Sequence, residues 1–383
     1  MTDAPGDTEF ASDDRTTVMK TVARPQVRVV EGREHYLLQL EGLEPGRRLR
    51  FGREPLRLGR RAPAEVLLAD PEVSGLHCEV VARGHQGDAW LTDLNSTNGS
   101  FVEGRRVQGS VRLTQGMRLQ IGRQVFVHEF RTPAEVAVAD ELAHDLDKAR
   151  RYVQSLLPAR VLQGDIRTDW CFEPCSALGG DAFGHVMLDD EHFACYLIDV
   201  SGHGVGAAVH SVSVMNVLRQ RLLPGADFRD PAQVLGQLNA MFQMDSHDGR
   251  MFSIWYGVFH RTRRTLRYAS GGHHPAYLAP ADGGPLQALR TRNLLIGAVP
   301  EVPFTAAEVG VPAGARLFVF SDGVFELQGR DGRDWGLDDL LPWLGQVPAD
   351  DASPAHWLQH AVLGQAKPGP LGDDFSLLAV TFA

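Results

Sequence analysis

Residues 193–204 read FACYLIDVSGHG, an apolar run that ends in an aspartate and a turn rich in glycine. The continuous apolar residues over 193–200 predict a strand that is buried on both faces. Asp199 therefore lies near the end of a core strand. A carboxylate in such a place is unfavourable unless a cation meets it, so this segment points to a cation-binding role.

Three further segments of the C-terminal part of the chain combine aspartate with glycine where we expect a strand to end in a turn. These segments are Gly179-Gly180-Asp181, Ser321-Asp322-Gly323 and Gly372-Asp373-Asp374. No run of lysine or arginine stands beside them to balance their charge. One such segment alone predicts no more than a turn. Together, and without basic partners, they predict a site for hard cations such as Mg²⁺ or Mn²⁺.

The charge of the chain is unevenly divided, which helps to separate two modules. Residues 25–131 hold sixteen basic and thirteen acidic residues, a net charge of +3, whereas residues 164–383 hold fifteen and twenty-five, a net charge of −10. The first module suits an anionic ligand and the second suits cations. The total of −10 also argues against general nucleic-acid binding, which needs clustered positive charge.

Composition excludes several classes of protein. The length of 383 residues predicts two or three domains, and 43% hydrophobic with 22% charged residues is typical of globular chains rather than collagen-like or disordered ones. No apolar run approaches the roughly 20 residues that cross a bilayer. The N-terminus is acidic and polar, unlike a signal peptide, so we expect a cytoplasmic protein without membrane contact. The four cysteines are too few for a disulfide scaffold, and Cys171 and Cys175 lack the second pair that a zinc site requires.

The pattern along the chain predicts four segments. Residues 1–24 are rich in Asp, Thr, Ser and Pro, which is typical of a disordered tail. Residues 25–131 contain short alternating runs divided by Gly, Asn and Arg turns, which predict an all-β sandwich. Residues 132–163 predict a helical linker. In residues 164–383 strand-like runs alternate with helical patterns, as in an α/β or α+β domain.

The linker carries one apolar stripe at helical spacing. Residues 134–157 have no glycine or proline, and Pro158 ends the pattern. The stripe consists of Val138, Leu142, Leu146, Ala149, Val153 and Leu156. Either this helix packs on its own domain or it pairs with a second copy as a short dimerising coiled coil. The pattern leaves both open, because about three heptads are near the lower limit for a coiled coil.

The aspartate segments occur in an order that is typical of one enzyme family. The chain contains GGD at 179–181, DVSGHG at 199–204, SGGHHP at 270–275, SDGVFE at 321–326 and DDFS at 373–376. With this order and spacing, residues 164–383 resemble the SpoIIE-type branch of the metal-dependent protein phosphatases, the PPM or protein phosphatase 2C-like family. The resemblance implies an α+β domain built as an αββα sandwich, which the helix joins to the β-sandwich. It also implies two divalent metal ions, Mn²⁺ or Mg²⁺, at one edge of the paired sheets.

The same resemblance implies roles for individual residues. Asp199 would bridge the two metal ions, and the carbonyl of Val200 would support one of them. Asp181 would hold the second ion, while Asp322 and Asp373 would complete the site of the first. The four aspartates together would form the catalytic centre, since a water held between two divalent ions becomes a hydroxide that attacks phosphorus.

Some positions depart from the family pattern or stay ambiguous. Gly184 stands where the family often has an aspartate, and residues 270–273 read SGGH instead of the usual NAGH. Asp374 is expected to orient its neighbours rather than bind a metal. Three histidines are candidates for acid catalysis, with a purely structural role in turns as the alternative: His203, His273 and His274.

Three segments of the N-terminal module, each a strand that runs into a polar turn, offer hydrogen-bond donors. They are RLGR at 57–60, EVSGLHCEV at 72–80 and TDLNSTNGSFV at 92–102. Arginine suits bidentate binding of phosphate, and hydroxyl and amide groups add neutral hydrogen bonds. Asn-Gly alone predicts only a hairpin turn, so the phosphate interpretation depends on all three segments.

Together these segments resemble a forkhead-associated (FHA) domain over roughly residues 27–130, with GR, SxxH and STNG in that order. The resemblance implies a phosphothreonine site formed by Arg60, Ser74, Thr97 and Asn98, with His77 bracing the loop. The residue after the SxxH serine commonly helps to bind the phosphate, and here it is Gly75. We therefore expect a lower affinity or a greater dependence on Arg60.

The leading hypothesis is a metal-dependent serine/threonine protein phosphatase that acts on a phosphorylated regulatory protein. Its FHA domain would recruit phosphothreonine-bearing partners or a Ser/Thr kinase. One alternative is a phosphothreonine-binding adaptor with an inactive phosphatase fold, but such a chain should lack a metal aspartate and none is missing. Another is a hydrolase of small phosphoesters. Thr16 and Thr17, which follow an acidic pair, add the hypothesis of a phosphorylated tail that docks at Arg60.

Overall fold

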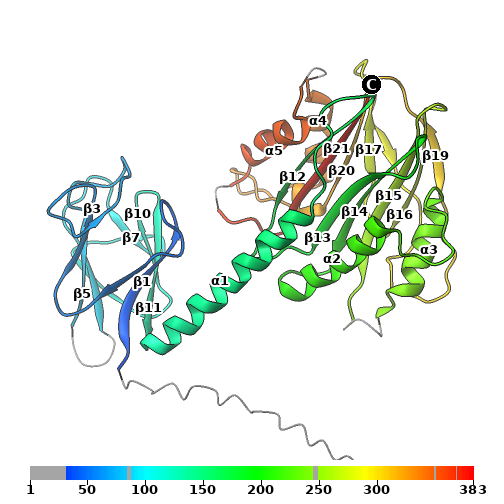
Figure 1. Ribbon diagram of the computed structural model, residues 1–383. Coiled ribbons are helices and arrows are strands. Elements are labelled where there is room, and N and C mark those ends of the chain that lie inside the picture. The colour runs from blue at the N-terminus through cyan, green and yellow to red at the C-terminus, as the bar shows by residue number, and fades with distance from the viewer. Residues whose placement is uncertain (1–31, 84–87, 245–248, 349–350, 368) are drawn as a thin grey trace, which may run out of the picture. The chain divides into compact units, whose positions relative to one another are not determined.

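The computed structural model describes residues 32–83, 88–244, 249–348, 351–367 and 369–383. The predicted disordered tail, with its two threonines, lies outside these residues, and the predicted segment boundaries stay predictions. The chain forms two compact units, Met1–Leu142 and Ala143–Ala383, which are described separately (Figure 1).

In the described residues of the N-terminal unit, all regular elements up to the end of β11 are strands. The strands are β1 (Glu34–Glu41), β2 (Arg48–Phe51), β3 (Leu56–Gly59), β4 (Val66–Leu67), β5 (Cys78–Ala82), β6 (Ala89–Asp93), β7 (Ser100–Val102), β8 (Arg105–Arg106), β9 (Ser110–Leu113), β10 (Arg118–Ile121) and β11 (Gln124–Arg131). They form one sheet in the order β2-β1-β11-β10-β7-β8 and a second in the order β4-β3-β5-β6-β9. The predicted all-β sandwich is therefore confirmed.

Alternation of apolar and polar residues explains how this sandwich closes. In β10, Leu119 and Ile121 are buried while Arg118 and Gln120 are exposed, because successive side chains of a strand point to opposite faces. The inward residues of both sheets, among them Leu119 and Phe126, join one core cluster. This core fixes the strands whose connecting loops carry the predicted phosphothreonine residues.

The described residues of the C-terminal unit form two further sheets and four α-helices after residue 164. The strands are β12 (Ile166–Glu173), β13 (Asp181–Met187), β14 (His192–Val200), β15 (Phe252–His260), β16 (Thr265–Gly271), β17 (Ala276–Ala279), β18 (Gln287–Leu289), β19 (Ala307–Gly310), β20 (Ala315–Phe320) and β21 (Phe375–Phe382). The helices are α2 (Val205–Gln220), α3 (Pro231–Met241), α4 (Leu337–Gln346) and α5 (Pro354–Leu363), and a short 3-10 helix, η2, spans Asp322–Val324. One sheet has the order β13-β14-β15-β16-β19 and the other β12-β21-β20-β17-β18.

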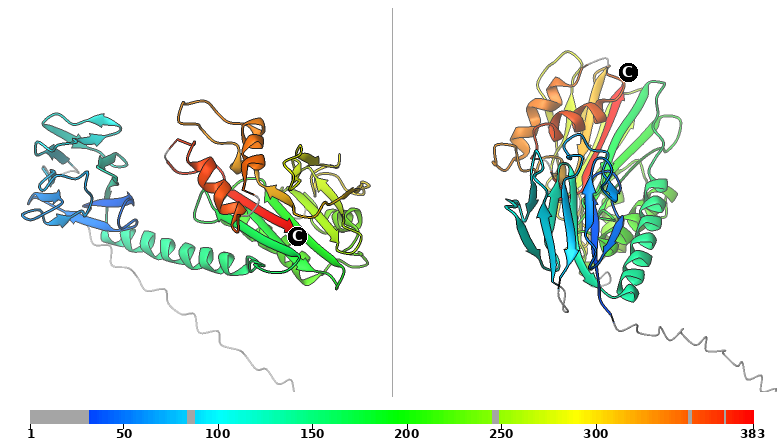
Figure 2. Two further views of the ribbon diagram at one scale, coloured as in Figure 1. Left: turned by 90° about the horizontal axis from the view of Figure 1, so that it is seen from above. Right: turned by 90° about the vertical axis from the view of Figure 1, so that its left-hand side faces the viewer.

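The two sheets pack face to face with helices on their outer faces, which confirms the predicted αββα sandwich (Figure 1, Figure 2). One cluster of buried side chains lies between the sheets. A second lies between the β14 sheet and helices α2 and α3, and a third between the β21 sheet and helices α4 and α5. Strand β14 is apolar throughout its middle because it contributes to two cores: Leu197 belongs to the cluster between the sheets and Ile198 to the cluster under α2.

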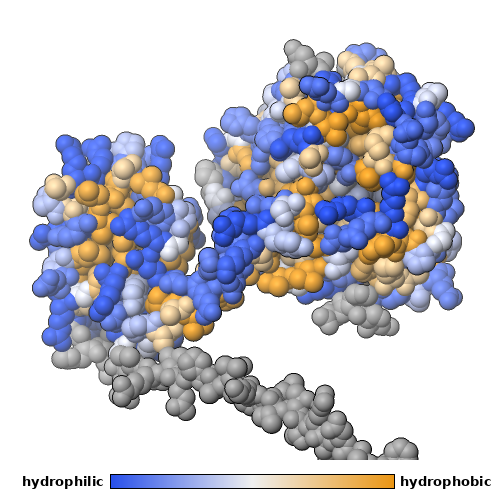
Figure 3. Space-filling model, viewed as in Figure 1, coloured by the Kyte–Doolittle hydropathy of each residue, from blue (hydrophilic) through white to orange (hydrophobic). Residues whose placement is uncertain are grey.

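Helix α1 (Pro133–Leu156) follows β11 directly. Its start is a capping box, since Glu135 N–H donates to the hydroxyl of Thr132 at 3.1 Å and Thr132 N–H donates to the carboxylate of Glu135 at 2.8 Å. No residue of α1 is buried, and Val138 and Leu142 are 66% and 60% exposed. Figure 3 shows hydrophobic surface around the first turns of this helix. Among the described residues, no helix is long and apolar enough to cross a membrane.

Candidate functional site

Asp199 points toward the space between the two sheets of the C-terminal unit. Cys195 and Leu197, four and two residues earlier in β14, belong to the core between the sheets, and alternation places Asp199 on the same face. Its antiparallel neighbours are Asp181 in β13 and Ser253 in β15. The carboxylates of Asp181 and Asp199 are therefore neighbours on adjacent strands at one edge of this sheet.

The second sheet brings two more aspartates to this edge. Phe320, the last residue of β20, pairs with Leu377 near the start of β21. Asp322 follows β20 in the 3-10 helix, and Asp373 precedes β21. The hydroxyl of Ser321 donates to the backbone carbonyl of Asp374 at 2.9 Å and ties the two segments together. The four predicted metal ligands thus lie at the same edge of the two sheets.

The expectation that every one of these aspartates stands where a strand ends is wrong for two of them. Asp181 is the first residue of β13, and Asp373 lies before β21. The reason is that β13 and β21 run antiparallel to β14 and β20, so that their starts meet the ends of their neighbours at one edge.

Asp374 has the supporting position that the resemblance implied. It is 2% exposed, and its carboxylate accepts hydrogen bonds from the backbone N–H of Cys175 at 2.8 Å and of Gly180 at 2.6 Å. A side chain at Gly179 would come within 2.5 Å of the same carboxylate, and one at Gly180 within 2.8 Å of the carbonyl of Gly202. Gly179 and Gly180 therefore have to be glycines, because neither position has room for a side chain.

The carboxylates at this edge repel one another and are poorly solvated. Burial raises the pKa of Asp199 to about 7, and the charges of Asp322 and Asp373 add to the effect. Burial also raises the pKa of Asp322 to about 6. The pKa of the buried Asp181 is raised well above its usual range by burial and by Asp199. Its Oδ2 atom has no hydrogen-bond partner among the described residues. A divalent cation would relieve all of these costs at once, so the donor set fits a metal site.

A pocket of about 390 Å³ opens beside these carboxylates. Its walls include Asp199, Asp322 and Asp373, together with Ser253 and Glu326, which sequence reasoning did not assign. Glu326 could have been predicted from the sequence, because it stands four residues after Asp322. In the structure its N–H donates to the carbonyl of Asp322 at 2.8 Å. Ser253 had no sequence signal, because only strand register brings it beside Asp199. Asp181 lies outside the lining of this pocket.

Two of the three motif histidines, His273 and His274, are enclosed by protein and bonded to the backbone. Burial lowers the pKa of His274 to about 4 and holds that of the buried His273 well below its usual range. The Nδ1 atom of each lies 2.8–3.0 Å from the carbonyl of the following residue. Both imidazoles are therefore neutral near pH 7 and donate to the backbone. His274 lines the pocket, whereas the exposed His203 does not.

Gly184 has a physical explanation in the structure. It pairs with Tyr196 across β13 and β14, and a side chain at Gly184 would come within 2.4 Å of the tyrosine hydroxyl. Tyr196 is almost fully buried, so it cannot swing away. The aspartate that the family often has at this position would not fit.

The predicted phosphothreonine residues also come together, at one end of the N-terminal sandwich. Ser74 Oγ accepts a hydrogen bond from Thr97 N–H at 2.9 Å and lies 3.3 Å from the hydroxyl of Thr97. Arg60 follows β3, and its N–H donates to the carbonyl of Ser74 at 2.8 Å. The side-chain amide of Asn98 donates to the carbonyl of Glu72 at 2.8 Å.

The buried His77 and the half-buried Asp93 hold these loops in place. His77 accepts a hydrogen bond from Ser74 N–H at Nδ1, and its Nε2 lies 3.2 Å from the carbonyl of Gly99, as expected for a bracing residue. Asp93, which sequence reasoning did not single out, accepts hydrogen bonds from the hydroxyls of Ser96 and Ser100, both at 2.7 Å. These bonds help to hold the pKa of Asp93 below its usual range against the opposing effect of burial.

Comparisons with known proteins agree with this geometry. The model of the family described as stage II sporulation protein E (SpoIIE) matches residues 189–383, just over half of the chain, and the FHA domain model matches residues 56–122. Phosphoserine phosphatase RsbP of Bacillus subtilis (strain 168) is 24% identical over 186 residues, which are 48% of this chain and 45% of that protein. FHA domain-containing protein FhaB of Mycolicibacterium smegmatis is 31% identical over 96 residues, which are 24% of this chain and 61% of that protein.

A solved structure supports the same fold. The SiaA-PP2C domain of Pseudomonas aeruginosa superposes with a TM-score of 0.57 at 19% identity, covering 64% of this chain and 99% of that one. At this identity the likeness concerns the fold alone. The chain spans about half of the length of the curated phosphatases that it matches.

Proposed function

Because the chain belongs to the SpoIIE family, we propose that its C-terminal unit is a metal-dependent phosphatase that removes phosphate from phosphoserine or phosphothreonine in a regulatory protein. The N-terminal FHA domain recruits phosphothreonine-bearing partners to it, with a Ser/Thr kinase among the candidates. For the substrate we propose its chemical class, a protein phosphorylated on serine or threonine.

The observation that carries this proposal is the uncompensated carboxylate cluster at the edge of the sandwich. In the described residues no lysine or arginine lines the pocket beside it. Asp181, Asp199, Asp322 and Asp373 supply the carboxylates, and Val200 supplies a carbonyl, for two Mn²⁺ or Mg²⁺ ions. The bound metals would lower the pKa of a shared water so that it attacks phosphorus as hydroxide.

The residues of the chain orient this chemistry. Asp374 fixes the backbone of the segment before β13 through its two N–H bonds, and so positions Asp181. Phe325 and Leu295 form an apolar part of the pocket wall and limit the access of water. The neutral His274 faces the same pocket without adding a positive charge that would compete for the cation sites. Retention of all four carboxylates speaks against the alternative of an inactive adaptor.

Dimerisation through residues 134–157 is a second part of the proposal. No residue of α1 is fully buried, and although Leu156 at its end packs against the core under α2, Val138 and Leu142 stay exposed. Pairing with a second copy would bury Val138 and Leu142, which are more than half exposed. Of the two interpretations that the sequence left open, the burial data favour the coiled coil.

The test is release of inorganic phosphate from a panel of phosphoserine and phosphothreonine peptides in Mn²⁺. We expect turnover by the wild-type chain and a loss of several orders of magnitude in Asp199→Asn, with reversible inhibition by EDTA. A matched control is Asp190→Asn, because this exposed aspartate lies in the turn between β13 and β14, at the opposite end of β14 from the cluster. Full activity of Asp199→Asn after removal of metal would refute the proposal.

A further inference from the structure

The space beside Ser74 in the FHA domain is open where a side chain would normally stand, and an arginine from another loop occupies it. A Cβ atom built on Gly75 meets only one heavy atom within 4 Å, which is Nε of Arg61 at 3.9 Å. The two loops are joined along their backbones, since Arg60 N–H donates to the carbonyl of Ser74 and Arg61 N–H to the carbonyl of Gly75 at 3.1 Å. The backbone of Arg61 is therefore anchored to that of Gly75, the residue after Ser74, and its guanidinium lies near Gly75.

The close contact of the two loops depends on Gly59. A Cβ atom at this position would lie 2.2 Å from the carbonyl oxygen of Gly75. With glycine at both positions, the end of β3 and the loop that carries Arg60 and Arg61 approach the Ser74 loop backbone to backbone. Both arginine side chains are exposed and begin at the same rim of the site.

The charge of these two arginines is uncompensated, unlike that of their neighbours. Arg57, three residues before Arg60, has Glu65 and Glu79 within 4.0 Å, and Arg123 pairs with Glu72 at 2.8 Å. Arg60 and Arg61 have no carboxylate within that distance among the described residues. Two adjacent, exposed guanidinium groups without a carboxylate partner are free to bind an anion that carries more than one charge.

We propose that Arg61 is a second phosphate-binding side chain of this site, so that Arg60 and Arg61 clamp one phosphothreonine between them. The phosphate of a phosphothreonine carries a charge of roughly −1.5 to −2 at pH 7 and three acceptor oxygens, enough for Ser74, Thr97 and two guanidiniums. Arg61 takes the place over Gly75 that no side chain of its own loop fills. The inference rests on the proposed phosphothreonine binding and deepens it.

The experiment is calorimetric titration of the full chain with a phosphothreonine peptide and with its unphosphorylated form. Loss of one charge-assisted hydrogen bond predicts a weakening of about tenfold in Arg61→Ala.

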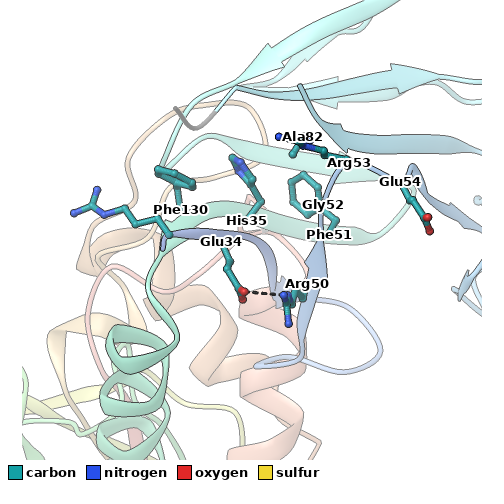
Figure 4. Close-up of a pocket in the computed structure, with 10 residues that line it drawn as sticks. Glu34, His35, Arg50, Phe51, Gly52, Arg53, Glu54, Ala82 and Phe130 are labelled. Carbon is teal, nitrogen blue, oxygen red and sulfur yellow. Dashed lines mark ion pairs between the residues drawn. The ribbon is translucent and has the colours of Figure 1, made fainter. Parts of the chain in front are cut away.

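The matched control is Arg53→Ala, which removes an exposed arginine that also lacks a carboxylate partner among the described residues. Arg53 lies on the wall of another pocket, together with Phe51 and Ala82 (Figure 4). Strand β5 runs from beside His77 to Ala82, so this pocket lies at the opposite end of the strand from the phosphothreonine loops. Arg53→Ala should leave the affinity within about twofold.

A rescue variant tests the position itself. Gly75 has room for a side chain, and its φ lies outside the left-handed region, so Gly75→Arg should fold normally. In the Arg61→Ala chain, Gly75→Arg should restore most of the lost affinity. The effect of Arg61→Ala should also shrink between pH 7.5 and pH 5, because the second phosphate pKa of about 6 converts the dianion to a monoanion.

The outcomes separate this inference from the function on which it rests. Suppose that Arg61→Ala binds the phosphothreonine peptide as well as Arg53→Ala does, while Arg60→Ala loses binding. Arg61 is then not a phosphate-binding side chain, and the proposed FHA function stands. If Gly75→Arg restores nothing, the place over Gly75 does not contact the phosphate, and the inference is overturned. If the wild-type chain does not distinguish the phosphorylated peptide, both the inference and the phosphothreonine function fail.

Discussion

Replacement of Asp199 by asparagine should make the metal-free protein more stable at neutral and alkaline pH, although it should abolish activity. In the absence of cations Asp199 is a poorly solvated carboxylate with Asp322 and Asp373 nearby, which raises its pKa to about 7. Asparagine keeps the shape of the side chain and removes its charge. The gain in stability should therefore equal the electrostatic cost of ionising Asp199 in the folded state.

The size of this gain follows from the pKa. An unfolded aspartate has a pKa of about 3.9, so between about pH 4 and pH 7 the folded protein holds a proton that the unfolded chain has lost. Stability of the metal-free protein consequently falls as pH rises through this window, by about 1.4 kcal/mol for each pH unit. Over the full window of about three pH units, the free energy of unfolding would fall by about 4 kcal/mol. Part of this cost is shared with Asp322, so we expect a gain of about 2–4 kcal/mol for Asp199→Asn at pH 8 and almost none at pH 4.

The assay is a urea series in EDTA, read by pulsed hydrogen exchange and mass spectrometry at pH 8 and pH 4.5. Peptides from β14 and β15 report the C-terminal unit alone, which matters because a chain with two units need not unfold in one step. Peptides from β11 serve as an internal reference. Addition of Mn²⁺ at pH 8 should make the wild type more stable than Asp199→Asn, since the wild type gains metal-binding energy that the variant lacks.

A second buried aspartate provides a control of opposite sign. Asp169 is 3% exposed and pairs with Arg160 at 2.9 Å, and it accepts a hydrogen bond from Ala355 N–H at 3.0 Å. Asp169→Asn should destabilise the C-terminal unit at pH 8, because it leaves Arg160 without its partner. If Asp199→Asn in EDTA at pH 8 is no more stable than the wild type, or gains as much at pH 4.5, the electrostatic account of the cluster is wrong.

Three further predictions concern other parts of the chain. Arg60→Ala should abolish phosphothreonine-peptide binding in calorimetry and leave hydrolysis of a small chromogenic phosphate ester nearly unchanged; unaltered peptide affinity would contradict the FHA assignment. Leu142→Glu should convert a dimer to a monomer in analytical ultracentrifugation, whereas Glu141→Gln beside it should not, and an unchanged mass for Leu142→Glu would exclude pairing through α1. Glu326→Gln should raise several-fold the Mn²⁺ concentration needed for half-maximal activity, because Glu326 contributes negative charge to the cluster; an unchanged metal titration would remove it from the site.

Much of the site could be predicted from the sequence because its ligands lie in short motifs at fixed positions. Asp199 and Asp322 each follow an apolar run, and that local signal is strong enough to place them at strand ends. The direction of the neighbouring strands is not a local property. Asp181 and Asp373 were therefore expected after strands, although they precede them, and only antiparallel pairing brings all four together.

Residues that act through tertiary contacts gave weaker signals or none. Ser253 faces Asp199 only through the register of β14 and β15. Arg61 lies over Gly75 only because two loops of the sandwich are hydrogen-bonded to each other. Neither contact could be read from spacing, since the partners are 54 and 14 residues apart in the sequence. By contrast, Glu326 belongs to the same turn as Asp322 and could have been included on sequence grounds.

The glycines of the motifs show why a correct pattern can carry an incomplete explanation. Sequence reasoning treats Gly323 as a turn residue, which would attribute it to backbone freedom, and explains Gly59 only as part of a motif. Neither has a φ in the left-handed region. A Cβ atom at Gly323 would lie 2.3 Å from the carbonyl oxygen of Asp374, and one at Gly59 would lie 2.2 Å from that of Gly75. In both units, glycine lets two backbones approach closely, and this brings the predicted site residues of separate segments to one place.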